Sequence, residues 1–126
     1  MSELLEKARK FEQDKIRQQD KRMRPLYHVS APVGWINDPN GLSEYDGRIH
    51  LFYQYYPYKR EWGSMHWGHS VTDDMIRWEQ LQTALAPDES YDKDGCFSGS
   101  AIEADGISFY SDKKAQISVE KYDIEL

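Results

Sequence analysis

The sequence predicts a mostly β protein, either a sandwich, a barrel or a propeller, preceded by one charged helix. From residue 26 onward, aromatic and β-branched runs are interrupted by turn residues roughly every eight to twelve positions. Before residue 25, apolar positions recur at three- and four-residue steps instead. With 39% hydrophobic and 30% charged residues among 126, the composition is typical of a globular domain and excludes a disordered or membrane-spanning chain.

Residues 1–24 are expected to form a surface helix that Pro25 ends, with Ser2 as its N-cap. This segment carries eight basic and five acidic groups, whereas the remaining residues carry eight basic and seventeen acidic ones. A basic arm for nucleic acid or a membrane surface is therefore an alternative, but the net charge of -6 and the narrow apolar stripe favour a helix packed on the body. The stripe comprises Leu4, Leu5, Ala8, Phe11 and either Lys15 or Ile16.

The next segment is expected to form a hairpin in which Asp46-Gly47 joins a short strand at 41–45 to a longer one at 48–55. Asp38-Pro39-Asn40-Gly41 is predicted to be a turn because its residue types favour turns. Further strands are expected at His66–Thr72, at 76–81 and at 96–103, with a polar loop at 87–94.

Residues 35–41, W-I-N-D-P-N-G, single out one candidate site. From the residues alone, this segment is first of all a turn preceded by a Trp. Its surroundings favour a second interpretation, because aromatic faces with amides and hydroxyls suit a carbohydrate. The side chains expected around the single carboxylate are Trp35, Asn37, Tyr53, Gln54, Trp62, His66, Trp67, His69, Phe97 and Ser98.

The same motif resembles the signature of glycoside hydrolase family 32, the β-fructofuranosidases, and is most similar to the bacterial sucrose-6-phosphate hydrolases within it. Four further stretches resemble the family in the same order: L-F-Y-Q-Y at 51–55, W-G-S-M-H-W-G-H-S at 62–70, D-D-M-I-R-W at 73–78 and G-C-F-S-G-S-A at 95–101. The resemblance implies part of a five-bladed β-propeller, hydrolysis of sucrose or sucrose 6-phosphate with retention, and no cofactor.

The resemblance also assigns roles to residues. Asp38 matches the nucleophile that forms a covalent fructosyl intermediate. The positions that shape the fructosyl pocket are matched by Trp35, Asn37, Gln54, Trp62, Phe97 and Ser98. A 6-phosphate group would need basic partners, for which Lys59, Arg60 and Arg77 are candidates.

Two other chemistries are weighed and not favoured. His66 and His69, with His28 and His50, suggest a metal site, but a His-x-x-His pair on a strand points to opposite faces, so no metal is expected. Cys96 is expected to be a small buried side chain rather than a nucleophile.

The chain also lacks motifs that the resemblance calls for. The family's acid/base Glu lies in Glu-Cys and its transition-state Asp in Arg-Asp-Pro, and neither sequence occurs among these residues. Residues 107–126 form a hairpin pattern, with a turn at 111–114, that resembles the last strands of the family's C-terminal β-sandwich. We therefore expect three parts, a helix at 1–24, a partial propeller at 25–106 and a sandwich-like tail at 107–126, joined by an internal deletion; a frameshift or a miscalled gene is the alternative.

The expected partner is a small fructoside, with no nucleic acid and no membrane. The exposed sheet edges of an incomplete propeller predict self-association. Because the family's acid/base Glu is missing, we expect little or no activity from this chain alone, and the alternative is a remnant that at most binds fructosides weakly. A single cysteine and the absence of a secretory signal predict a cytoplasmic location.

Overall fold

The computed structural model describes residues 2–104 and 107–112. It contains one long helix, α1 (Glu3–Gln18), a short 3-10 helix, η1 (Lys21–Met23), and six strands. The strands are β1 (Trp35–Tyr45), β2 (Arg48–Tyr56), β3 (His66–Thr72), β4 (Glu79–Gln80), β5 (Gly99–Ala104) and β6 (Ile107–Asp112). The expected mostly β architecture with an N-terminal helix is confirmed.

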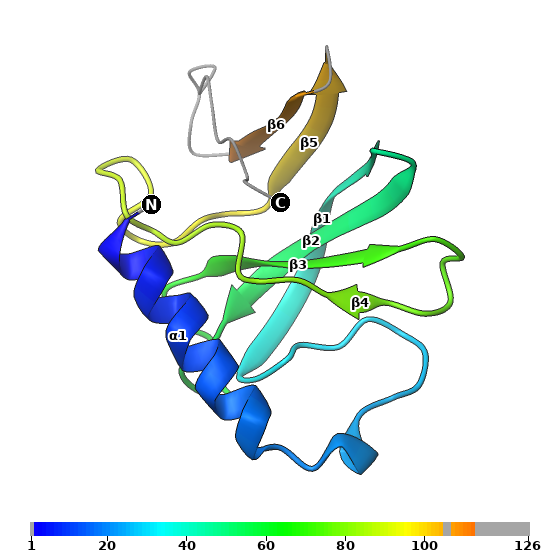
Figure 1. Cartoon of the computed structure of the whole chain (residues 1–126). Coiled ribbons are helices and arrows are strands. Elements are labelled where there is room, and N and C mark those ends of the chain that lie inside the picture. The colour runs from blue at the N-terminus through cyan, green and yellow to red at the C-terminus, as the bar shows by residue number, and fades with distance from the viewer. Residues whose placement is uncertain (1, 105–106, 113–126) are drawn as a thin grey trace.

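The strands form two antiparallel sheets, and α1 lies beside the larger one (Figure 1). The four-stranded sheet has the order β1-β2-β3-β4, so neighbours in sequence are neighbours in space. β5 and β6 form a separate two-stranded sheet, paired from Gly99 with Asp112 to Ala104 with Ile107. The turn expected at 111–114 lies largely outside the described residues.

Helix α1 begins as predicted but ends earlier than predicted. The Ser2 side chain accepts a hydrogen bond from the Leu5 amide at 3.1 Å and so caps the helix. The helix does not continue to Pro25, because Gln19 is extended and the Asp20 carboxylate caps η1 by accepting from the Arg22 amide at 3.0 Å. This local side-chain bond competes with helix continuation.

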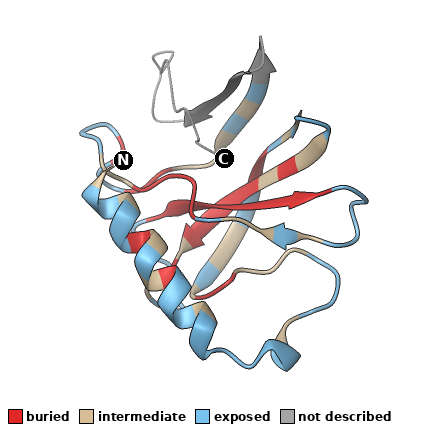
Figure 2. Ribbon diagram, in the orientation of Figure 1, coloured by how far each residue is buried: buried red, intermediate tan, exposed pale blue. Residues whose placement is uncertain are grey.

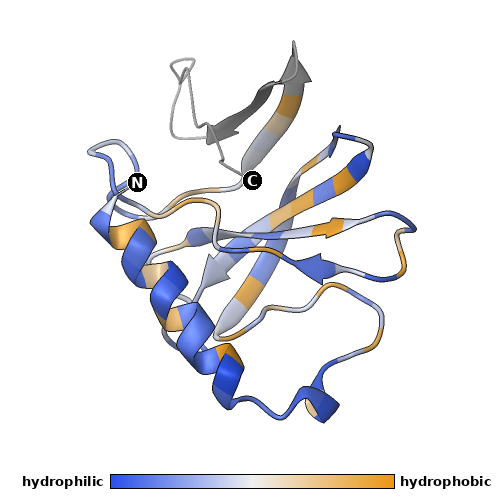
Figure 3. Cartoon of the chain, viewed as in Figure 1, coloured by the Kyte–Doolittle hydropathy of each residue, from blue (hydrophilic) through white to orange (hydrophobic). Residues whose placement is uncertain are grey.

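A buried carboxylate holds α1 against the body. Figure 3 shows a mostly hydrophilic helix with short hydrophobic stretches, and Figure 2 shows that little of it is buried. Glu12 is only 2% exposed and accepts hydrogen bonds from the amide and hydroxyl of Thr83 at 3.2 and 3.3 Å. Arg9 Nε donates to the Thr83 carbonyl at 2.9 Å. Burial raises the pKa of Glu12, so its protonated form is favoured relative to a solvated glutamate.

The segment 38–41 is part of strand β1, which corrects the expected turn. β1 pairs with β2 from Trp35 to Tyr45, with register shifts between Ile36 and Pro39 and between Asn40 and Ser43. Pro and Gly residues that favour turns also favour β-bulges, and here long-range pairing with β2 makes bulges of them. Gly41 adopts a φ of 57°, which suits glycine, so the strand bends next to Asp38.

The other strands agree more closely with the prediction. The Asp46-Gly47 hairpin and the strand His66–Thr72 are confirmed. The stretch expected at 76–81 shortens to β4, because Asp74 Oδ1 accepts from the Ile76 and Arg77 amides at 2.8 and 2.7 Å and makes a turn there. The strand expected at 96–103 begins instead at Gly99.

The four-stranded sheet has an apolar cluster on each face. One cluster contains Phe52, Trp67, Ala84, Leu85 and Cys96, with Ala101 packed against it. The other contains Val33, Tyr53 and Tyr55, with Ile16 of α1 and three loop or strand residues packed against it. On β2, Phe52 therefore faces one cluster while Tyr53 and Tyr55 face the other, as the alternation of side chains along a strand requires.

Candidate active site

Asp38 lies in the bulged part of β1, where its side chain is exposed. Ser98 Oγ donates a hydrogen bond to Asp38 Oδ2 at 3.3 Å, although the two residues are 60 positions apart in the sequence. The contact joins the 35–41 motif to the segment just before β5. The structure thus places a carboxylate and a hydroxyl side by side at the junction of the two sheets.

Trp35 and Asn37 lie on the same strand, two residues apart. The Trp35 indole Nε1 donates to Asn37 Oδ1 at 2.9 Å. This bond fixes the orientation of the Asn37 amide, while Trp35 itself remains 36% exposed. An aromatic ring and an oriented amide beside Asp38 are groups that a sugar can use, the ring for C–H faces and the amide for hydroxyls.

Gln54 supports the segment that carries Ser98. It is 4% exposed, and its Nε2 donates to the Cys96 carbonyl at 2.8 Å. Trp67 Nε1 donates in the same way to the Phe97 carbonyl at 3.0 Å. Two adjacent strands, β2 and β3, therefore hold residues 96–98 by their main chain, and this fixes Phe97 and Ser98 next to β1.

Trp62 makes no direct contact with Asp38 among the described residues. It is on the loop between β2 and β3 and is 62% exposed, and within the described residues no hydrogen bond or ring contact joins it to Asp38. The structure brings together Trp35, Asn37, Asp38, Gln54, Phe97 and Ser98, and leaves Trp62 on an exposed loop.

Two further residues lie beside the site: Asn40, which the sequence analysis did not single out, and Trp67, which it expected near the carboxylate without giving it a role. Asn40 is 9% exposed and its Nδ2 donates to the Asp38 carbonyl at 3.4 Å, so it braces the bulge from within the same motif. Trp67 positions Phe97 as described above. Trp67 could have been linked to the site through Gln54, because the two residues are paired across β2 and β3. That pairing is visible only once the strand register is known.

The histidines do not form a metal centre in the described part of the chain, where no group of three or more His, Cys, Asp or Glu side chains lies close enough to hold an ion. His50 Nδ1 and His69 Nε2 are hydrogen-bonded at 2.9 Å, while His66 Nδ1 bonds the Ser64 carbonyl at 2.9 Å. Burial lowers the pKa of His66 to about 4 and that of His69 to about 3. Both rings are therefore neutral at pH 7 and serve the packing.

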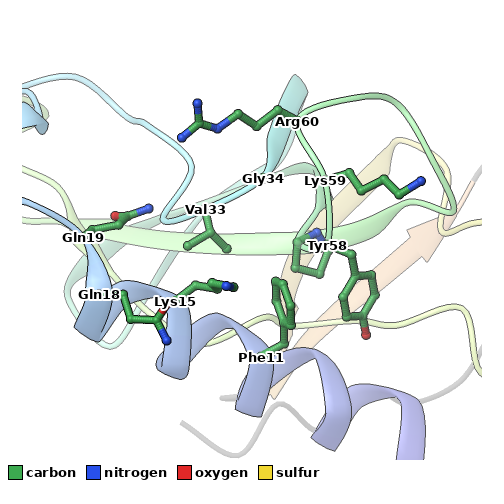
Figure 4. Close-up of a pocket in the computed structure, with 10 residues that line it drawn as sticks. Phe11, Lys15, Gln18, Gln19, Val33, Gly34, Tyr58, Lys59 and Arg60 are labelled. Atoms are coloured by element: carbon green, nitrogen blue, oxygen red, sulfur yellow. The ribbon is translucent and has the colours of Figure 1, made fainter.

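The basic residues considered for a phosphate group lie elsewhere. Lys59 and Arg60 line a pocket of about 250 Å³ between α1 and the loop after β2, shown in Figure 4. A second pocket of about 540 Å³ adjoins the loop at 23–34. Arg77 pairs with Asp74 at 3.3 Å. None of the seven predicted site residues lines either pocket.

Cys96 is buried as predicted, and its Sγ donates to Asp92 Oδ2 at 3.7 Å. No helix in the described residues is long and apolar enough to cross a membrane.

Comparisons with known proteins identify the family to which most of the chain belongs. Residues 28–122, about three quarters of the chain, match the model of the glycosyl hydrolases family 32 N-terminal domain. Sucrose-6-phosphate hydrolase of Zymomonas mobilis is 54% identical over 83 residues, which are 66% of this chain and 16% of that protein. The Escherichia coli sucrose-6-phosphate hydrolase is 53% identical over the same share of this chain and 17% of its own.

Solved structures give the same result. A sucrose-6-phosphate hydrolase from Lactobacillus gasseri superposes with a TM-score of 0.70 at 35% identity, covering 80% of this chain and 21% of that one. A mutant Bombyx mori β-fructofuranosidase in complex with sucrose superposes with a TM-score of 0.70 at 48% identity, over 79% of this chain and 21% of that one.

Most of the chain therefore forms part of a glycosyl hydrolase domain. The chain belongs to family 32 of the glycosyl hydrolases, matching its N-terminal domain. It spans about one sixth of the length of the curated relatives described above.

Proposed function

We propose that this chain carries the fructosyl-binding side of a family 32 active site, with Asp38 as the nucleophile. The observation that carries the proposal is the Ser98–Asp38 hydrogen bond at 3.3 Å, which joins two separate sequence motifs in one place. Relatives named for hydrolysis of sucrose 6-phosphate and a relative in complex with sucrose indicate the substrate class. The proposed substrates are sucrose or sucrose 6-phosphate.

In the proposed reaction, an Asp38 oxygen attacks the anomeric carbon of the fructosyl unit and forms an ester bond to it. The glycosidic C–O bond breaks, and its oxygen leaves with the glucosyl part after taking a proton from an acid. Water then cleaves the ester, giving its proton to the same group acting as a base, and releases fructose with retained configuration. Trp35, Asn37, Gln54, Trp62, Phe97 and Ser98 are the proposed fructosyl-binding residues.

The acid is the group that this sequence does not supply in the family's form. A retaining enzyme places its acid/base about 5 to 5.5 Å from the nucleophile. Since neither Glu-Cys nor Arg-Asp-Pro occurs among the 126 residues, the polypeptide alone is proposed to have little or no turnover. This favours a second candidate function, a non-catalytic remnant that at most binds fructosides weakly.

Two measurements distinguish these functions. Glucose release from sucrose should be at background for the purified chain, and release that Asp38→Asn abolishes would establish an active enzyme instead. Calorimetric titration with fructose should give weak binding, and Ser98→Ala should weaken it further. No binding of fructose, sucrose or sucrose 6-phosphate would reject the fructosyl-binding site and leave only a remnant that does not bind fructosides.

Three structural statements accompany the functional one as proposals. The four-stranded sheet is proposed to be one blade of a five-bladed propeller, and the β5–β6 pair the start of the next, since propeller blades have four strands. The division into 1–24, 25–106 and 107–126, with the internal deletion, stays a proposal. The family model matches beyond residue 106, to residue 122. A cytoplasmic location is also proposed, supported by the buried single cysteine.

Self-association is proposed on the exposed surface of the strands. β1 is an edge of its sheet, and Leu42 on β1 and Ile102 on β5 are 58% and 65% exposed. Light scattering across a concentration series should show oligomers, and a monomer at all concentrations would contradict this proposal.

A further inference from the structure

The loop between β2 and β3, residues 57–65, carries the exposed Trp62. Helix α1 contacts this loop at the Tyr58 ring. The Phe11 and Tyr58 rings meet edge to face with centroids 5.1 Å apart. Figure 4 shows the two rings side by side, Phe11 from α1 and Tyr58 from the loop. Lys7 of α1 lies over the same Tyr58 ring, with its Nζ 5.8 Å from the centroid.

Tyr58 also packs against two other aromatic rings near the ends of the loop. Its ring lies 5.5 Å from that of Tyr56 and 5.7 Å from that of His66. The other end of the loop is fixed as well, because a Cβ on Gly63 would lie 2.5 Å from Cε1 of the Tyr56 ring. Trp62 is next to Gly63, so the position of Trp62 follows from how Tyr56 and Tyr58 are packed.

We propose that α1 is a brace for the substrate-binding loop, with Phe11 and Tyr58 as positioning residues that act through Trp62. The inference rests on the proposed function, in which Trp62 binds the fructoside. Helix α1 lies outside the residues that the family model matches, so the brace is an addition to the matched domain. Since Glu12 holds the helix to Thr83 and Ile16 packs against the cluster of Val33, Tyr53 and Tyr55, loss of the Phe11 ring should free the loop without detaching α1.

The test uses trypsin under native conditions, because Lys59 and Arg60 are exposed on the loop and their side chains extend away from the Phe11 ring in Figure 4. Mass spectrometry compares cleavage after these residues with cleavage after Lys93, which is exposed in the 87–94 loop. Phe11→Ala should raise the ratio of cleavage after Lys59 and Arg60 to cleavage after Lys93 at least about tenfold, because local opening controls native-state proteolysis. Tyr58→Phe keeps the ring and should leave the ratio unchanged.

Ile16→Ala is the matched control. It shortens an apolar side chain of the same helix, but one that packs against the cluster of Val33, Tyr53 and Tyr55 and not against Tyr58. It should lower the melting temperature without raising the ratio. Equal ratios in Phe11→Ala and Ile16→Ala would overturn the brace.

Fructose affinity, measured on the same proteins by calorimetry, tests whether Phe11 and Tyr58 position Trp62 for substrate binding. Phe11→Ala should weaken it about as much as Trp62→Ala does. An open loop with unchanged affinity, where Trp62→Ala does weaken binding, would overturn the positioning role. If the parent chain binds no fructose but Phe11→Ala still opens the loop, the proposed function fails and the brace stands.

Discussion

Acidification should destabilise this protein through His66, whose ring is buried at the start of β3. The side chain is 3% exposed, and its Nδ1 donates to the Ser64 carbonyl at 2.9 Å. Burial is the main cause that lowers the pKa to about 4, against which the Ser64 carbonyl and the charge of Asp88 act weakly. A solvated histidine has a pKa of about 6.5, so folding keeps a proton off this ring.

The sign and the size follow from this difference. Below about pH 6.5 the unfolded chain takes up a proton at His66, whereas the folded chain does not until about pH 4. The stability contribution is therefore complete above pH 6.5 and is lost as the pH falls toward 4. One pKa unit corresponds to about 1.4 kcal/mol, so about 1.5 units between pH 6.5 and 5 amount to about 2 kcal/mol.

The assay is urea unfolding of the parent chain and of His66→Gln at pH 7 and pH 5. Gln keeps a donor near Ser64 but does not titrate. The parent should lose about 2 kcal/mol more between the two pH values than the variant does. Groups such as Glu12 and His69 titrate in both proteins, so their contributions cancel. Equal losses in the two proteins would refute a pKa set by burial.

Other substitutions have equally definite expectations. A Cβ on Gly68 would lie 2.0 Å from Cε2 of the buried Tyr53 ring, so Gly68→Ala should lower the free energy of unfolding by about 3 kcal/mol or more. Gly47 has nothing within 4 Å of a Cβ and a φ of 72°, so Gly47→Ala should lower it by only about 1 kcal/mol. Urea midpoints at pH 7 measure both, and the reverse order would contradict the packing. Glu12→Ala should lose about 2 kcal/mol, because the buried Thr83 amide loses its acceptor. Glu12→Gln keeps an acceptor and replaces a carboxyl group whose pKa is raised by burial, so it should lose less than about 1 kcal/mol of stability at pH 7. Equal losses of stability in Glu12→Ala and Glu12→Gln would argue against the hydrogen bond to Thr83 as the anchor of α1.

Local chemistry was enough to predict the elements that depend on neighbours in sequence. Ser2 caps α1, Asp46-Gly47 closes the hairpin, and His66–Thr72 is a strand, all as expected from propensity and alternation. Residues 38–41 were mispredicted as a turn because the same Pro and Gly form bulges once β2 pairs with them. That pairing is a long-range contact, which residue types alone do not reveal.

The candidate site shows the same division. Asp38 was found from its motif, but its contact with Ser98 depends on where residues 96–98 are held by Gln54 and Trp67. Gln54 was expected to bind sugar, and the structure shows it donating to a main-chain carbonyl. Asn40, in the same motif as Asp38, was overlooked because an Asn between Pro and Gly is typical of a turn.

A fructose titration of the 15N-labelled chain, followed by amide and indole NMR shifts, tests the fructosyl site at Asp38 directly. Saturable shifts are expected at Trp35, Asn37, Asp38, Phe97 and Ser98, and at the Trp35 indole, whose N–H is bonded to Asn37. Asp38→Asn should change or remove them. No saturable shift at any fructose concentration, or shifts confined to the pocket between α1 and the loop after β2, would contradict a fructosyl site at Asp38.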